Sequence, residues 1–191
     1  IYDIDHNGFQ TLQDFLDYSE GAAVAPGAIF MHFCGARGDN GQFDVPLFDI
    51  REASRPIAIF CYLVHIIRDF QKDQNNELNY FAGDLMQKFG LDNTTLKECA
   101  ADGRPTPGLR NMFGVYYRRI EEYQRRARSM IDKIGIHLEP RYSLSLEIVY
   151  SLYSHVFEKI DITNGTFTSA ELNPSPAEVE ERIYSTVSQF K

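Results

Sequence analysis

Apolar residues in this chain recur mostly three and four positions apart, which places them on one face of an α-helix. No segment alternates apolar and polar residues over the length of a strand, so the pattern predicts an all-α protein. The 191 residues show no linker and no internal repeat, and we expect a single domain over 1–191. A first helix is expected from Thr11, and further helices are expected over 21–35, 56–74, 83–89, 94–101, 109–134, 144–160 and 176–190.

The segment 21–35 is apolar or small at nearly every position, so we expect it to be buried on all sides. Pro26 and Gly27 should kink or interrupt its helix. A broken helix of small residues brings backbone close either to another helix or to a ligand, and the sequence leaves both alternatives open.

The helix expected from Pro56 combines an apolar stripe with an acidic one. Its apolar stripe consists of Ile59, Leu63, Ile66 and Phe70, and the polar stripe beside it consists of Ala58, Tyr62, His65, Asp69 and Asp73. Asp69 and Asp73 would lie near buried surface, where unpaired carboxylates are costly. Mg²⁺ would remove that cost, because it commonly takes one or two carboxylates plus substrate phosphate. A solvated helix end with scattered charges is the alternative, because D-x-x-x-D alone is a weak pattern.

Composition narrows the class of protein. The hydrophobic content of 43% and charged content of 24% are ordinary for a globular protein, and the net charge of −8 argues against nucleic-acid binding. Cys34, Cys61 and Cys99 are widely spaced and form no C-x-x-C pair, so neither a zinc cage nor a disulfide framework is expected. Free thiols fit a reducing, cytoplasmic setting.

Two features bear on targeting. No run reaches the ~18 uninterrupted apolar residues of a membrane span. The sequence begins at Ile1 and shows no signal peptide, so we expect a fragment or a processed product.

The segment from Asp3 to Asp14 matches the spacing of an EF-hand calcium loop. Asp or Asn stands at positions 1, 3 and 5, Gly8 at position 6 and a carboxylate at position 12. Position 12 is Asp instead of the usual bidentate Glu, and Gln10 stands where an apolar residue is normal. The sequence has no entering helix before Asp3, so calcium binding is the weaker interpretation.

The helix expected over 109–134 is rich in arginine. Its basic residues are Arg110, Arg118, Arg119, Arg125, Arg126, Arg128 and Lys133, and its acidic residues are Glu121, Glu122 and Asp132. Seven minus three leaves +4 in a chain whose net charge is −8. A solvated face with Glu–Arg pairs is the usual interpretation, and diphosphate binding is the alternative.

Two blocks of sequence resemble a known family. The first is the spaced set Arg68, Asp69, Asp73, Tyr80 and Asp84. This set is similar to the second aspartate-rich segment of the squalene/phytoene synthase family. The second block, YSEGAAVAPG over 18–27, is similar to the family's Y-x-x-x-V-A-x-x-x-G segment. Both blocks occur in the right order, and the resemblance spans the whole chain.

The resemblance implies an all-α isoprenoid-synthase bundle with Mg²⁺ as cofactor. In that family two prenyl diphosphates, such as farnesyl or geranylgeranyl diphosphate, condense head to head through a cyclopropyl intermediate. The family's first aspartate-rich motif would lie upstream, so the chain looks like the C-terminal two-thirds of a member without its N-terminal helices. Family members make lipid-like products, which allows peripheral contact with a membrane. The oligomeric state and the product stay open.

The resemblance also implies roles for particular residues. The implied metal ligands are Asp69 and Asp73, and the implied catalytic residues are Tyr18 and Tyr80, which would face an allylic cation. The implied substrate-binding residues are Arg68, Lys72, Tyr62, His65, Ala22 and Tyr153. Packing is the alternative role for each tyrosine, and a structural hydrogen bond is the alternative for His65.

The chain departs from the family pattern at several positions. Tyr62 and His65 stand where the family usually has Gln and Asn, and Leu78 and Ala82 replace the Arg and Pro of its R-x-Y-x-P segment. These departures favour a rival hypothesis, a non-catalytic member that acts as a lipid- or protein-binding assembly factor. The intact acid pair favours the enzyme.

Overall fold

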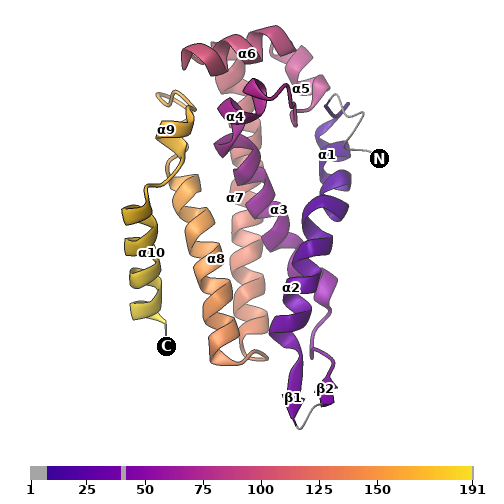
Figure 1. The fold of residues 1–191 in the computed structure, drawn as a ribbon. Coiled ribbons are helices and arrows are strands. Elements are labelled where there is room, and N and C mark those ends of the chain that lie inside the picture. Colours follow the sequence, from indigo (N-terminus) through magenta and orange to yellow (C-terminus); the bar gives the residue numbers. More distant parts are fainter. Residues whose placement is uncertain (1–7, 40–41, 191) are drawn as a thin grey trace.

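Helix α3 (Ile50–Arg68) lies in the middle of the structure, where it packs against α2 (Ala25–Gly35), α7 (Pro107–Gly135) and α8 (Pro140–Glu158) (Figure 1). The structure is a computed structural model that describes residues 8–39 and 42–190. The other elements are α1 (Leu12–Ser19), the π-helix η1 (Glu20–Val24), the strands β1 (Arg37–Asp39) and β2 (Gln42–Asp44), and the helices α4 (Phe70–Asn75), α5 (Gly83–Lys88), α6 (Asn93–Asp102), α9 (Ser169–Leu172) and α10 (Pro176–Gln189).

The all-α class predicted from the sequence is confirmed. The expected helices over 83–89, 94–101, 109–134, 144–160 and 176–190 all occur, with ends shifted by a few residues. The strands β1 and β2 were not expected; they pair antiparallel, with Arg37 opposite Asp44. Strands of three residues are too short for an alternating pattern to be recognised.

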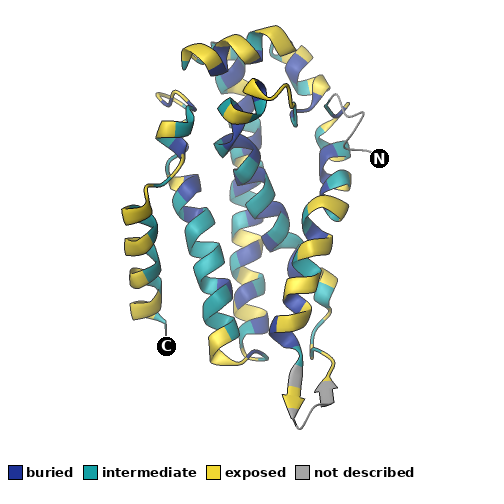
Figure 2. Cartoon of the chain, viewed as in Figure 1, coloured by how far each residue is buried: buried dark blue, intermediate teal, exposed yellow. Residues whose placement is uncertain are grey.

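The apolar stripe of α3 forms the centre of the core, and Figure 2 shows this helix as a mixture of buried and intermediate residues. Its members Ile59, Leu63 and Ile66, with Phe70 of α4, are at most 1% exposed. The stripe predicted from spacing is therefore confirmed. Burying each such side chain contributes about 1.5–3 kcal/mol to stability, so α3 fixes the bundle around it.

Helix α3 begins earlier than predicted. Pro56 was expected in the first turn, but the helix starts at Ile50 and Pro56 lies inside it. Asp49 is the N-cap, because its carboxylate accepts a hydrogen bond from the Glu52 backbone N–H at 2.7 Å. This cap and the burial of Ala53 stabilise the helical turns before Pro56, although proline has no backbone N–H to donate a helical hydrogen bond.

The expectation that 21–35 is buried on all sides is wrong. Ile29, Phe30 and Phe33 are 62%, 42% and 67% exposed. One face of α2 packs on α3, where a Cβ built on Gly27 would lie 3.3 Å from the Ala58 Cβ. Gly27 therefore serves tight helix–helix packing, while no described helix or strand packs over Ile29 and Phe33 on the opposite face.

The irregularity predicted at Pro26 and Gly27 lies a few residues earlier. In the π-helix η1, the Ala25 backbone N–H donates to the Glu20 carbonyl, an i→i+5 bond. Glu20 is fixed to α3 by ion pairs with Arg51 at 2.7 Å and with Arg55. Burial raises the pKa of Glu20, but the two arginines outweigh it and hold this pKa below the usual range.

The EF-hand look-alike falls largely outside the described residues, because Asp3, Asp5 and Asn7 are not among them. The carboxylate at its position 12, Asp14, instead completes a capping box with Thr11 at the start of α1. It accepts hydrogen bonds from the Thr11 backbone N–H and hydroxyl, both at 2.9 Å.

The arginine-rich helix α7 forms several of the expected ion pairs. Arg119 and Arg126 both pair with Glu122, and Arg128 pairs with Asp132 and with Glu147 of α8. Within the described part of the chain, no helix is long and apolar enough to cross a membrane. The three cysteines are free thiols.

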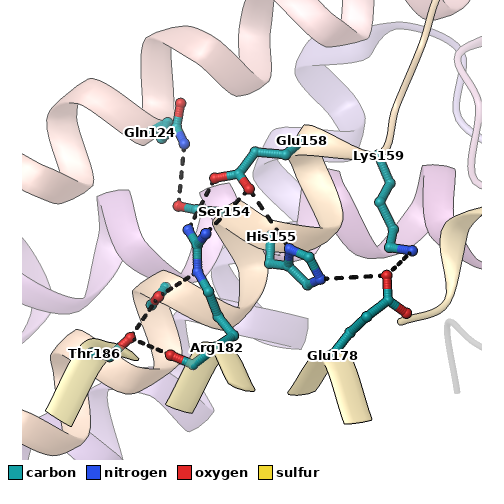
Figure 3. Close-up of polar contacts among 9 residues, drawn as sticks. Gln124, Ser154, His155, Glu158, Lys159, Glu178, Arg182 and Thr186 are labelled. Carbon is teal, nitrogen blue, oxygen red and sulfur yellow. Dashed lines mark hydrogen bonds and ion pairs between the residues drawn. The ribbon is translucent and has the colours of Figure 1, made fainter. Parts of the chain in front are cut away.

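Helix α10 is attached to α8 mainly through polar contacts (Figure 3), and none of its residues is buried. Arg182 donates to Ser151 at 2.8 Å and pairs with Glu158 at 2.9 Å. Lys159 pairs with Glu178 at 2.7 Å. Contacts of this kind are individually weak, so α10 is the part of the structure we expect to open first.

Replacing Arg182 with Ala should loosen α10. The change removes the contacts to Glu158 and Ser151, which together stabilise docking by about 1 kcal/mol, so amide exchange in α10 should accelerate about fivefold. Hydrogen exchange followed by mass spectrometry measures this. Arg141→Ala is the control, because Arg141 pairs with Glu139 at the start of α8 and not with α10. Equal exchange rates in the two variants would contradict the prediction.

Candidate active site

An apolar cavity of about 420 Å³ lies between α2, α3 and α8. Helix α2 contributes Gly27 and Met31, and α8 contributes Leu146 and Val149. The lining on α3 consists of Ser54, Ile57, Ala58, Cys61, Tyr62 and His65. Burial raises the pKa of the Cys61 thiol to about 12, so this side chain stays neutral and adds to the apolar wall.

The acidic stripe begins one turn beyond the cavity. His65 belongs to the cavity lining, and Asp69 follows it four residues later at the end of α3, about 6 Å along the helix. The hydrogen bonds from Asp69 N–H to His65 C=O and from Asp73 N–H to Asp69 C=O are 2.9 and 2.8 Å long. They carry the helical path across the junction between α3 and α4, so the carboxylates stay one turn apart.

Asp69 is buried and fully engaged by its neighbours. Its Oδ1 accepts from Arg68 Nε at 2.7 Å and its Oδ2 from Arg68 Nη2 at 3.1 Å. Arg68 Nη2 also donates to His65 Nδ1 at 2.7 Å, which places the His65 proton on Nε2, 3.2 Å from Asp69 Oδ2. Burial raises the pKa of Asp69, but the Arg68 hydrogen bond and the Arg68 and Lys72 charges outweigh it and hold this pKa below the ordinary value of 3.8.

His65 is held neutral. Burial lowers its pKa, assisted by the neighbouring Arg68 and Lys72 charges and opposed by Asp69, so the pKa lies below the ordinary 6.5. A neutral imidazole can accept from Arg68 and donate to Asp69 at the same time.

Asp73 is in the opposite situation. Its half-buried carboxylate accepts no hydrogen bond and forms no ion pair with the residues that the structure describes. Burial and the nearby Asp69 charge raise its pKa to about 6. A carboxylate held in this way favours a cation, and shifts of this size concentrate at functional sites.

These residues suit a Mg²⁺ ion that would be coordinated by protein carboxylates and substrate phosphate together. Within the described part of the chain, no three His, Cys, Asp or Glu side chains come together to enclose a metal ion. Mg²⁺ commonly binds through one or two carboxylates and completes its shell with water and phosphate oxygens. Asp73 has unengaged oxygens for this purpose, whereas Asp69 would share its oxygens with Arg68 and His65.

Three tyrosines gather beside the acid pair. The Tyr62 ring lies 6.4 Å from the Tyr18 ring and 6.4 Å from the Tyr80 ring, and it stacks on Phe15 at 5.2 Å. Tyr18 comes from α1, Tyr62 from α3 and Tyr80 from the loop before α5. The fold thus brings together aromatic residues from three separate parts of the chain.

The loop that carries Tyr80 is anchored by the two residues that follow it, Phe81 and Ala82. Phe81 is 2% exposed and packs against Phe70 and Phe113, and the Ala82 backbone N–H donates to the Tyr116 hydroxyl at 2.9 Å. This hydrogen bond satisfies a fully buried backbone group. Tyr80 therefore stands next to a rigid support.

A family model for squalene/phytoene synthase matches residues 1–178 of this chain. The chain belongs to the squalene/phytoene synthase family. Its fold is similar to a dehydrosqualene synthase solved in complex with ligand, with TM-score 0.70 and 16% identity over 97% of this chain. It is also similar to squalene synthase HpnC from Alicyclobacillus acidocaldarius, with TM-score 0.64 and 16% identity over 95% of this chain. No curated protein matches the chain in sequence.

The chain spans 60% and 56% of the lengths of those two solved proteins. At 16% identity, the similarity establishes the fold, an all-α bundle of the isoprenoid-synthase type. The predicted family and fold class are both confirmed.

Most of the residues predicted for the site of this squalene/phytoene synthase family member come together. Tyr62, His65 and Tyr153 line the cavity, Arg68, Asp69 and Asp73 follow at its end, and Tyr18 and Tyr80 flank Tyr62. Lys72 is exposed next to the acids. Ala22 is exposed on η1 and does not line the cavity; its neighbour Ala23 does.

The wall formed by α8 was missed in the sequence, apart from Tyr153. Leu146 and Val149 precede it by seven and four residues, so all three share one face of the helix. The same spacing is present in the sequence and could have identified them. The hydrogen bonds that join Arg68, His65 and Asp69 were less accessible, because they depend on side-chain rotamers.

Proposed function

We propose that this protein condenses two prenyl diphosphates, farnesyl or geranylgeranyl diphosphate, head to head to a squalene- or phytoene-type product. The observation that carries the proposal is the acid pair Asp69 and Asp73 at the end of an apolar cavity of about 420 Å³. A prenyl diphosphate has a charged head and an apolar tail. The head suits the acid pair, through Mg²⁺, and the tail suits the apolar cavity.

At the diphosphate end, the residues of this chain hold and orient charge. Mg²⁺, when bound, would neutralise the diphosphate and make it a better leaving group. Asp73 would offer its unengaged oxygens to the metal. Arg68 fixes the Asp69 carboxylate with two hydrogen bonds, and its remaining N–H groups can donate to diphosphate oxygens. Lys72 adds an exposed positive charge on the same turn.

At the tail end, the residues exclude water and face a cation. Loss of diphosphate leaves an allylic cation, which water captures unless the cavity is dry. Tyr62 and Tyr153 line that cavity, and Tyr18 and Tyr80 lie beside Tyr62, so several π-faces can stabilise positive charge. Because His65 is neutral, it adds no competing positive charge.

The test uses the natural full-length protein with farnesyl or geranylgeranyl diphosphate and Mg²⁺. We expect a C30 or C40 product together with release of diphosphate, and no turnover in Asp73→Ala, because Mg²⁺ would lose its least encumbered ligand. Gas chromatography of the extracted product measures the reaction, and circular dichroism confirms that the variant is folded. No product and no Mg²⁺-dependent diphosphate release would refute the proposal.

A second candidate is a non-catalytic role as a lipid- or protein-binding assembly factor. Both oxygens of Asp69 accept hydrogen bonds from Arg68, and His65 lies 3.2 Å from one of them, which makes Asp69 a less available metal ligand. The apolar cavity would then hold a lipid without chemistry. Tight binding of a prenyl lipid with no release of diphosphate would favour this alternative.

A further inference from the structure

A second groove, of about 490 Å³, lies between α3 and α7. Its lining on α3 includes Arg55 and Pro56, whereas Ile57 and Ala58 line the apolar cavity. The two linings share no residue, and with 3.6 residues per turn the set Glu52, Arg55 and Pro56 lies roughly half a turn around the helix from Ser54, Ile57 and Cys61, so the groove and the cavity open on different faces of α3. The groove is separate from the candidate active site.

The groove is strongly basic. Its charged lining consists of Arg55, Arg125, Arg126, Lys133 and Glu52, which is four positive charges minus one negative charge, or +3. The whole chain carries −8. A concentration of positive charge against such a background attracts anions to this surface.

Two of the four cations are available to a ligand. Arg125 forms no ion pair with any residue in 8–39 or 42–190. Lys133 pairs with Glu52 at 3.2 Å, but their side chains are 66% and 62% exposed, and exposed pairs of this kind are weak. An incoming anion can therefore replace Glu52 at little cost.

The other two cations are held in position. The Arg126 guanidinium lies 5.3 Å from the centre of the Tyr123 ring and pairs with Glu122 at 2.5 Å. Arg55 pairs with Glu20. Because both side chains are already ordered, less conformational entropy is lost when a ligand binds.

The floor of the groove is apolar. Pro56 and Met130 are partly buried there, and the Tyr123 ring is 4% exposed. We propose that this groove binds a phosphate-bearing anion that also has an apolar part. Guanidinium groups match phosphate oxygens with paired N–H donors, which favours phosphate over a single carboxylate. Arg125, Arg126 and Lys133 contact the phosphate, and the apolar part lies on Met130.

Isothermal titration of the natural protein with inorganic diphosphate, in the absence of divalent cations, tests the phosphate half of the site. The double variant Arg125→Ala, Lys133→Ala should bind about tenfold more weakly, because two charge-assisted contacts are lost. Arg118→Ala is the matched control, since Arg118 is an exposed arginine of α7 outside the groove and has no ion pair with a described residue. All of these are exposed helix positions, where alanine is well tolerated.

A second experiment distinguishes whether the phosphate belongs to a lipid headgroup or to a free anion. Vesicles of phosphatidylcholine with and without phosphatidic acid test a lipid headgroup, and inorganic diphosphate tests a free anion. Binding to either ligand that is weakened by the double variant and kept in Arg118→Ala supports the site and identifies its source. No binding to either ligand, or equal affinity in the double variant, overturns it. The double variant and its control change only α7 residues that lie outside the candidate active site, so this result is independent of the prenyltransferase proposal.

Discussion

Replacing Asp73 with Asn should stabilise the fold at pH 8 while abolishing the Mg²⁺-dependent turnover that we propose. Burial and the Asp69 charge raise the pKa of Asp73 to about 6 from an ordinary 3.8. The folded state therefore holds a proton that the unfolded state has already lost between these two values. The free energy of unfolding therefore falls as the pH rises from 3.8 to about 6. Above this range the folded protein bears the full cost of an ionised Asp73.

The neutral amide of Asn removes that cost. We expect a gain of about 1 kcal/mol in the free energy of unfolding at pH 8, once the solvent screening of a half-buried group is allowed for, and no gain at pH 4. Turnover should fall more than about a hundredfold, because several kcal/mol of charge stabilisation depend on the metal. Urea denaturation at several pH values measures the first effect and product formation the second.

Asp69→Asn is the matched control, with the opposite sign. Asp69 has a lowered pKa, so its stabilisation is complete above 3.8 and is lost as the pH falls through the lower folded value. Its replacement breaks the charge-assisted bonds from Arg68 and should cost about 2 kcal/mol at pH 7. Stability changes of the same sign in both variants would contradict this account of the pair.

Phe60→Ala should be the most destabilising single change in α3. The Phe60 ring is fully buried and packs against the rings of Tyr150 and Phe157 in α8, at 5.7 and 6.4 Å. The cavity left behind should cost about 4 kcal/mol, a large share of the ~5–15 kcal/mol that stabilises a domain. Because α8 also forms one wall of the apolar cavity, that wall should loosen as well.

Chemical denaturation measures the loss in Phe60→Ala, and hydrogen exchange in α8 measures the loosening. Tyr184→Ala is the control, because it also truncates an aromatic ring but at a side chain that is 68% exposed. It should change stability by less than about 0.5 kcal/mol. A loss below about 1.5 kcal/mol in Phe60→Ala would show that α8 collapses onto the vacated space.

The sequence predicted the helices well because their signals are local. Thr11 and Asp14 form the capping box at the start of α1, and Ser175 caps α10 in the same way. The apolar stripe from Ile59 to Phe70 is buried as its spacing requires. Pro56 misled the prediction, because a local rule placed it in the first turn while the Asp49 cap set the start of α3 at Ile50, six residues earlier.

The features that could not be predicted from the sequence depend on contacts between distant segments of the chain. The exposure of Ile29 and Phe33 depends on which elements pack against α2, and composition does not contain that information. The acid pair and its tyrosines could be proposed from two motifs. The bidentate hold of Arg68 on Asp69 and the unengaged state of Asp73 came only from the positions of side chains in space.

The π-helix η1 joins α1 to α2 in one nearly continuous helix and sets the rotation of α1 relative to α2 about the helix axis. Its wide turn accommodates one residue more than an α-helix does, which rotates everything before Glu20 by about 100° relative to α2. Tyr18 can therefore face Tyr62 while Ala23 and Gly27 face the apolar cavity. The number of residues in this turn, more than their identity, keeps the aromatic cluster and the cavity aligned on the same site.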